Sequence, residues 1–335
     1  MGTVIISVIM AMTALFGQMF SVSQTVEAKE KVIVTVPAAE SASDPFFTYN
    51  DGMYYYCCAY GEGVAISKSE NLYDLFGAEK SVVYELPEGG MYAHNLWAPE
   101  LHYIRGEWYI YFAADDGNNE NHRMYVLKGT SQDPTEQFEM VGKISDTSDK
   151  WAIDGTVLEI ENELYFIWSG WEGDTDGKQE LYIAHMSSPT EIDSERHLLS
   201  TPTHVWEKKG MPLNEGPQVL KKGDNVYVVF SASGSWTDDY CLGIMMLRGN
   251  DPLKKSCWAK STMPVFRKGN GIYGPGHASF ITAGDGTDYI VYHGNSVKGS
   301  SWGGRQGRIQ KFTWLNGFPV FGRPVRDGAG VEFAK

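Results

Sequence analysis

Three acidic residues occupy comparable places in copies of an internal repeat. Asp44, Asp154 and Glu215 each lie eight residues before a turn residue of the same copy, which is Gly52, Asn162 or Gly223. Repeats that close into a ring bring equivalent positions together on the axis. Two facing carboxyl groups can then hydrolyse a glycosidic bond, one as acid on the leaving oxygen and the other as base on water or as nucleophile. A third carboxyl nearby raises the pKa of the acid, because like charges resist joint ionisation.

The repeat itself predicts the fold. A fourth copy has Ala98 at the matching place and a fifth has His277, so the steps from Asp44 onward are 54, 56, 61 and 62 residues. Each copy has an alternating apolar run, a turn, and a return strand rich in Tyr, Trp, Ile and Val. Five units of about four strands predict an all-β fold, a five-bladed β-propeller with the active site in its central funnel. The alternative is a pair of β-sandwiches with chance similarity between the runs.

The chain divides into two parts. Residues 1–28 resemble a secretory signal peptide, with an apolar stretch over 4–22 and a small-residue cleavage pattern at 26–28. The alternative is an uncleaved N-terminal anchor, since the stretch is nearly long enough to span a bilayer. Residues 29–335 are predicted to be a single five-bladed catalytic domain, secreted or periplasmic.

The composition of the chain disfavours several classes of binding partner and one class of metal site. A net charge of −14 and a pI of about 5.0 disfavour nucleic acid and anionic membrane, so we expect no nucleic-acid partner and no integral membrane partner. The four cysteines contain no CxxC pair, which argues against a zinc site. A disulfide between Cys241 and Cys257 and buried free thiols are both open interpretations.

Five motifs resemble those of glycoside hydrolase family 43. They are Ser43-Asp44-Pro45, Trp97-Ala98-Pro99-Glu100-Leu101, Ile153-Asp154-Gly155-Thr156, Asn214-Glu215-Gly216-Pro217 and Gly274-Pro275-Gly276-His277. The resemblance extends from about residue 35 to 325 and implies an inverting glycosidase on a five-bladed propeller. It implies Asp44 as general base, Glu215 as general acid, and Asp154 as the residue that adjusts the pKa of the acid and orients substrate. An inverting site predicts a separation of roughly 6.5–9.5 Å between the carboxyls of Asp44 and Glu215.

The resemblance also indicates supporting residues. His277 is expected near the propeller axis beside a structural calcium or other ion, with contact through water more plausible than direct ligation; no cofactor is required for the chemistry. Relatives often carry an active-site arginine in the last blade, and either Arg305 or Arg308 fits that position. The candidates for contact with sugar rings at the mouth of the site are Trp97, His94, Trp171 and Trp236.

The predicted substrate is a plant cell-wall oligosaccharide or polysaccharide that contains arabinose or xylose. The motifs most resemble those of the compact α-L-arabinofuranosidases, which would release terminal arabinose from arabinan, arabino-oligosaccharides or arabinoxylan. A β-xylosidase or a bifunctional enzyme is the alternative within the family. A carbohydrate-binding propeller without catalysis is the alternative outside it, although the presence of all three acids speaks against that interpretation.

Overall fold

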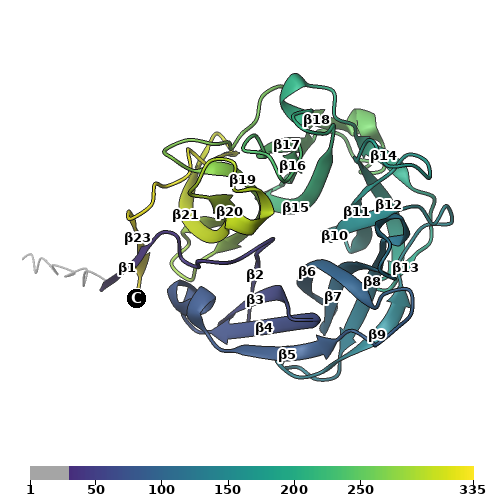
Figure 1. Ribbon diagram of the computed structural model, residues 1–335, viewed down its shortest axis with the longest axis horizontal. Helices are drawn as coiled ribbons and strands as arrows, with labels where there is room; N and C mark the ends of the chain where they lie inside the picture. Colours follow the sequence, from purple (N-terminus) through teal and green to yellow (C-terminus); the bar gives the residue numbers. More distant parts are fainter. Residues whose placement is uncertain (1–29) are drawn as a thin grey trace, which may run out of the picture.

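Five antiparallel sheets surround a central axis in a computed structural model that describes residues 30–335 (Figure 1). The strand nearest the axis in each sheet is β2, β6, β10, β15 or β19, and the later strands of the sheet lie progressively farther out. The predicted five-bladed propeller is therefore confirmed. The predicted signal peptide, residues 1–28, lies outside the described residues.

The first three blades follow one another along the chain. Blade 1 contains β2 (Phe46–Asn50), β3 (Met53–Tyr60), β4 (Gly63–Ser69) and β5 (Lys80–Glu85), with η1 (Leu72–Gly77) between the last two. Blade 2 contains β6 (His94–Ile104), β7 (Glu107–Asp115), β8 (Arg123–Gly129) and β9 (Phe138–Lys143), with η2 (Asn119–Asn121) after β7. Blade 3 contains β10 (Ala152–Ile160), β11 (Glu163–Gly170), β12 (Glu180–Ser188) and β13 (Glu191–Ile192), with β14 (His197–Ser200) also paired to β12.

The last two blades repeat the pattern. Blade 4 contains β15 (Asn214–Lys222), β16 (Asn225–Ala232), β17 (Cys241–Leu247) and β18 (Trp258–Lys260), flanked by η3 (Val205–Glu207) and η4 (Lys255–Cys257). Blade 5 contains β19 (Tyr273–Thr282), β20 (Asp288–Asn295), β21 (Arg305–Leu315) and β22 (Phe318–Val320), with η5 (Ser301–Gly304) before β21. Among the described residues, no helix is long and apolar enough to cross a membrane.

The innermost strands of blades 2 to 5 are each interrupted by a bulge at the same level, and in blade 1 the residue at that level, Asp44, lies just before β2. At this level one residue per blade lies in the left-handed region, with φ between 43° and 56°, at Asp44, Ala98, Asp154, Gly216 and His277. In blades 2 to 5 the antiparallel register shifts at this point. A bulge redirects the side chains beside it, which is how a strand end can aim a functional group toward the axis.

The bulges correct the predicted register of the fourth repeat by one residue. Gly216, not Glu215, is equivalent to Asp44 and Asp154, and the turn that follows it is Gly223–Asp224, between the paired residues Lys222 and Asn225. Glu215 forms the last ladder pair before the bulge, with Ser231, just as Ile153 pairs with Ser169 in blade 3. The side chain of Glu215 therefore reaches the site from a different backbone position than the side chains of Asp44 and Asp154.

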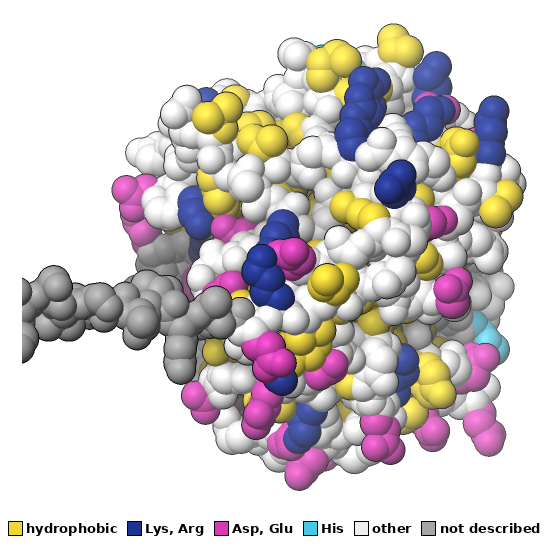
Figure 2. Space-filling view, turned by 90° about the vertical axis from the view of Figure 1, so that its left-hand side faces the viewer, with side chains coloured by type: hydrophobic (Ala, Val, Ile, Leu, Met, Phe, Trp, Pro, Cys, Tyr) yellow, Lys and Arg dark blue, Asp and Glu magenta, His cyan; other side chains and the backbone are white. Residues whose placement is uncertain are grey.

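The ring is closed by the two ends of the described chain. Strand β1 (Lys31–Thr35) pairs with β23 (Gly330–Ala334) in a separate two-stranded sheet. The segment after β1 then follows the last blade, where Ala39 and Gly307 form a β-bridge. Figure 2 shows acidic and basic side chains intermixed on this side of the molecule. Lys31 of β1 forms an ion pair with Glu332 of β23. Blade 5 is thus fastened to blade 1 through backbone as well as side chains.

The blades pack through apolar and aromatic side chains. Between blades 2 and 3, Trp151 and Trp171 stack with ring centroids 4.7 Å apart and planes within 7°. The cysteines contribute no cross-link, because all four are free, and Cys57, Cys58 and Cys241 are buried. The interpretation of Cys241 and Cys257 as a disulfide is therefore wrong for this structure, and burial of apolar surface stabilises the fold without it.

Candidate active site

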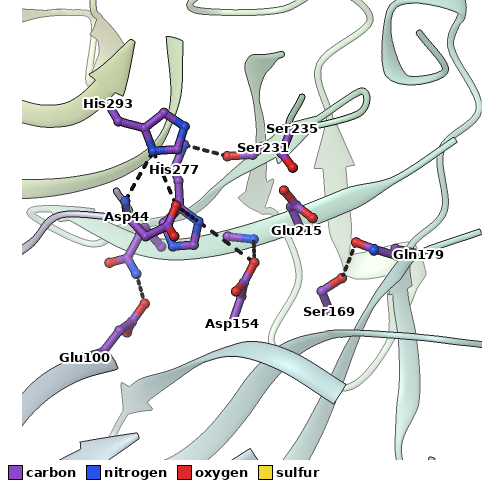
Figure 3. A network of polar contacts seen from close by, with 12 residues as sticks. Asp44, Glu100, Asp154, Ser169, Gln179, Glu215, Ser231, Ser235, His277 and His293 are labelled. Carbon is purple, nitrogen blue, oxygen red and sulfur yellow. Dashed lines mark hydrogen bonds and ion pairs between the residues drawn. The ribbon is translucent and has the colours of Figure 1, made fainter. Parts of the chain in front are cut away.

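The bulged ends of the inner strands bring the three predicted acids to one place (Figure 3). His277 joins two of them, since its Nδ1 lies 3.2 Å from Oδ1 of Asp44 and 3.9 Å from Oδ2 of Asp154. The backbone N–H of Gly216 donates to Oδ2 of Asp154 at 2.9 Å, so the residue next to Glu215 is tied to the second acid. Residues from blades 1, 3, 4 and 5 therefore meet around a single group of carboxyls.

Asp44 is surrounded by nitrogen donors. Nη1 of Arg305 lies 3.2 Å from Oδ1 and 3.5 Å from Oδ2 of this carboxylate, and His277 contacts the same Oδ1. Burial alone would raise the pKa of Asp44, but the charges of His277 and Arg305 outweigh burial and hold that pKa far below its usual range. Asp44 is thus ionised at any pH near neutral, as a general base must be before it accepts a proton.

His293 supports Asp44 as a neutral ring. The backbone N–H of Asp44 donates to Nδ1 of His293 at 3.2 Å, and because an amide can only donate, Nδ1 is the unprotonated nitrogen. Burial, followed by the charge of Arg305, lowers the pKa of His293 to about 3. His293 therefore adds no positive charge near pH 7 and acts as a fixed hydrogen-bond acceptor.

The other two acids have the opposite electrostatics. Burial raises the pKa of Glu215 to about 7; the charge of Asp44 also raises it, while a hydrogen bond from Tyr240 and the charge of Arg305 lower it. Burial, then the charges of Glu215 and Asp44, raise the pKa of Asp154 well above its ordinary value. Glu215 and Asp154 therefore hold a proton between them near neutral pH, while Asp44 holds none.

A second polar contact crosses the ring beyond the acids. Glu100 of blade 2 accepts a hydrogen bond from Gln218 of blade 4, two blades that are not neighbours. The other carboxylate oxygen of Glu100 contacts Nε2 of His102 at 2.9 Å. Glu100 and Gln218 are both buried. Each follows its bulge residue by two positions, so this pair closes the axis beneath the three acids and holds two non-neighbouring blades together.

The predicted aromatic contacts divide into exposed and buried rings. Trp97 is 38% exposed and stacks on His122 with centroids 3.9 Å apart, so its ring can receive a sugar. His94 is exposed at the first position of β6. Trp171 is only 2% exposed and packs on Trp151, which corrects the prediction that it contacts substrate.

A further aromatic pair lies beside Arg305. Trp236 is 38% exposed and meets the edge of Trp302, which is 58% exposed, with centroids 5.9 Å apart. Nε1 of Trp302 donates to Oγ of Ser235 at 3.0 Å, and Nη2 of Arg305 donates to the carbonyl oxygen of Ser235 at 3.5 Å. This chain of contacts places the two tryptophans next to the arginine that holds Asp44.

The structure separates the two arginines that the sequence left open. Arg305 contacts Asp44, whereas Arg308 is fully buried and donates through Nη2 to Ser296, Gln306 and Asp327. Residues three positions apart in a strand lie on opposite faces of the sheet. Arg308 is therefore a structural residue, and its prediction as a substrate contact is corrected.

The described residues around His277 form no direct ligand set for calcium, and an ion held there through water stays a prediction. Its Nδ1 faces Asp44 and its backbone N–H donates to Oγ of Ser231 at 2.8 Å. Within residues 30–335, no group of three or more His, Cys, Asp or Glu side chains could hold a metal ion. Calcium requires six to eight oxygen ligands, and the donors here are nitrogen atoms or carboxylates already paired with them.

Sequence reasoning missed three residues of the site: His293, Tyr240 and Trp302. His293 lies inside the buried strand β20, in the run Tyr292-His293-Gly294-Asn295, and a polar residue inside such a run is a signal. Tyr240 carries no signal, because a tyrosine beside a β-strand is common in any β-rich core. Trp302 lies in a loop rich in glycine and serine, where an exposed aromatic residue could have been noticed.

Comparison with known proteins places the chain in the family whose motifs its sequence resembles. A model of glycosyl hydrolases family 43 matches residues 35–319. An extracellular exo-alpha-(1->5)-L-arabinofuranosidase of Streptomyces avermitilis is 34% identical over 320 residues, which are 91% of this chain and 66% of that protein. The protein of the same name from Streptomyces chartreusis is 33% identical over 78% of this chain and 82% of its own length.

Solved structures agree with the sequence comparison. The crystal structure of an alpha-L-arabinofuranosidase from Lactobacillus brevis has a TM-score of 0.83 and 31% identity, covering 88% of this chain and 98% of that chain. Alpha-L-arabinofuranosidase 43 of Humicola insolens is 30% identical, with 62% of its length matched. The chain thus spans slightly under two thirds of the Streptomyces avermitilis and Humicola insolens relatives.

Proposed function

Because this chain belongs to glycosyl hydrolase family 43, we propose that it is an inverting exo-α-L-arabinofuranosidase that releases terminal arabinose from arabinan or arabino-oligosaccharides. One observation carries the proposal. In a single group of side chains, Asp44 has its pKa held far below the ordinary range while the pKa of Glu215 is raised to about 7. Two carboxyls with pKa values pushed apart are a base and an acid that coexist at neutral pH.

The proposed reaction uses these two groups in one displacement. Glu215 gives its proton to the glycosidic oxygen as the bond from the anomeric carbon to that oxygen breaks. Asp44 removes a proton from the water that attacks the same carbon from the opposite face. The sugar is released with inverted configuration, and solvent returns a proton to Glu215 and takes one from Asp44. No step passes through a metal or an organic cofactor.

The arginine sets the charges of this pair, and the third acid lies beside it. Asp154 accepts a hydrogen bond from the backbone N–H of Gly216 and lies near His277. It is therefore placed to fix the backbone next to Glu215 and to accept a hydrogen bond from a sugar hydroxyl. Arg305 keeps Asp44 ionised and also has a second amino group for substrate. The separation of roughly 6.5–9.5 Å between Asp44 and Glu215 stays a prediction of the inverting mechanism.

The substrate assignment draws on the relatives and on the rim. The Streptomyces relatives bear the name exo-alpha-(1->5)-L-arabinofuranosidase and are described as extracellular, which supports arabinose as the released sugar and secretion of this protein. Trp97 offers one exposed ring, and Trp236 with Trp302 offers a second surface next to Arg305. We assign these rings to sugar units on either side of the scissile bond, with His94 near Trp97 as a polar contact.

Proton NMR of linear 1,5-α-arabino-oligosaccharides during digestion tests the proposal. Early appearance of free β-arabinose establishes both release from the chain end and inversion. Early α-arabinose would overturn the inverting mechanism, and cleavage of xylo-oligosaccharide alone would move the substrate to xylosides. The variant Glu215→Gln should still bind the oligosaccharide by calorimetry yet release arabinose at least 10³-fold more slowly, by analogy with general acid–base contributions of about 10²–10⁴. Binding without turnover in the unmodified protein would support a carbohydrate-binding propeller instead.

A further inference from the structure

A buried tyrosine is hydrogen-bonded to the catalytic acid. The hydroxyl of Tyr240 donates to Oε1 of Glu215 at 2.7 Å, and Tyr240 is completely buried. Tyr240 lies just before β17, outside the inner strands that carry the acids. Because this bond occupies one carboxyl oxygen, the proton that Glu215 would transfer must be on the other, Oε2.

The fold gives Tyr240 a fixed place. A Cβ atom on Gly276 would lie 2.3 Å from its ring, so only glycine at that position leaves space for it. The strand next to Gly276 supplies a parallel neighbour, since His293 pairs with Gly276 and its ring lies within 6° of the Tyr240 ring, with centroids 5.7 Å apart. The ring is thus held against the histidine that supports Asp44. Moving the hydroxyl oxygen away from Glu215 would require the packing around the ring to open.

We propose that Tyr240 is a positioning residue for the reaction, which selects Oε2 of Glu215 as the proton-donating oxygen and stabilises the carboxylate left after proton transfer. This inference rests on the proposed function of Glu215 as general acid. A bond to Oε1 is stronger when Glu215 is negatively charged than when it is neutral. It therefore favours the state that follows proton transfer over the state that precedes it, which is the condition for lowering the barrier.

The other charged groups around the acid do not duplicate this role. Those that face Glu215 or Tyr240 are Asp44, Asp154, Arg305, His277 and His293. Arg305 lowers the pKa of Glu215 through its charge but donates to Asp44, and Asp154 accepts from Gly216. Burial and the charge of Glu215 raise the pKa of Tyr240 well above its usual value, so its hydroxyl remains a donor over the whole working pH range.

The test is the pH dependence of kcat/KM for Tyr240→Phe on arabinobiose. Glu215 must be protonated to act, so activity is present below its pKa and is lost as pH rises through about 7. The Tyr240 bond lowers that pKa, so its removal should move the alkaline limb upward by about one pH unit, the order expected for a hydrogen bond to a charged group. The kcat at the optimum should fall roughly tenfold, and less for an arabinoside whose leaving group needs no protonation.

Two matched variants make the result specific. Tyr227→Phe removes the hydroxyl of another buried tyrosine, which donates to the carbonyl of Gly317 at 2.7 Å, and it should leave the limb in place. Replacing Tyr240 with 3-fluorotyrosine makes the donor more acidic and should move the limb downward, even if the phenylalanine variant folds poorly. An alkaline limb that stays fixed in both Tyr240 variants would overturn the inference.

Failure of the proposed function gives a different pattern. If Glu215→Gln hydrolyses arabinobiose at the unmodified rate, Glu215 is not the acid and the premise is wrong. If Glu215→Gln is inactive while both Tyr240 variants keep the original limb, the acid assignment stands and only the role of Tyr240 is lost.

Discussion

Replacing Arg305 by methionine should raise the pKa of Asp44, the proposed general base. Arg305 places a full positive charge against Asp44, with Nη1 3.2 Å from one oxygen and 3.5 Å from the other. Two unit charges about 4 Å apart interact by about 4 kcal/mol at an effective dielectric constant of 20. The side chain of Asp44 is 19% exposed and keeps its contacts with His277 and His293, so we take roughly half of this, about 2 kcal/mol.

The sign follows from the role of the base. Asp44 acts only when ionised, so activity is present above its pKa and is lost as pH falls through it. The unmodified protein has that pKa held far below the usual range, which keeps the acid limb of kcat/KM below the pH range of ordinary assays. Loss of the Arg305 charge raises the pKa, and 2 kcal/mol corresponds to an upward move of the acid limb by about 1.5 pH units.

The assay is kcat/KM for p-nitrophenyl α-L-arabinofuranoside from acid to neutral pH, with melting curves at each end to confirm folding. Arg305→Lys is the matched control, because it keeps the charge and loses only the planar fork; its limb should move much less than that of Arg305→Met. If the two variants lose activity equally and neither limb moves, Arg305 contributes binding rather than the ionisation of Asp44, and the electrostatic argument is refuted.

Three further predictions follow from other parts of the structure. Arg308→Met should lower the free energy of unfolding by about 3 kcal/mol, because it removes the hydrogen bonds of a fully buried guanidinium to half-exposed Asp327 and to two further side chains, while KM stays the same; thermal melting and steady-state kinetics check this, and an unchanged Tm would contradict it. Trp97→Ala should raise KM for arabinotriose about tenfold, or about 1.4 kcal/mol, with kcat changed little; equal KM values would exclude Trp97 as a sugar platform. Dithiothreitol should leave the melting temperature unchanged since the four cysteines are free, whereas a drop of several degrees would reveal a stabilising disulfide.

The periodic features of the chain could be read without the structure. The spacing of Asp44, Ala98, Asp154 and His277 follows from one supersecondary unit repeated five times, and alternation with turn residues is a local property of each strand. These features were enough to predict five blades and to select the acids. Glu215 also lies in the group of acids, although its assumed equivalence to the other two was off by one residue, because a bulge adds a residue that periodicity alone does not locate.

Contacts between residues far apart in the sequence could not be predicted, because they form only when the five blades close into a ring. Arg305 and Arg308 lie on one strand, and the sequence does not say which face of that strand meets Asp44, 261 positions away from Arg305. Trp97 and Trp171 are the same residue type, but Trp171 is buried against Trp151 whereas Trp97 stays 38% exposed. The bond between Tyr240 and Glu215 needs a glycine in the next blade to make room. Local patterns determine which strands form and where they turn, whereas the charge on each carboxyl depends on burial and on partners that only the packed blades bring within hydrogen-bond distance.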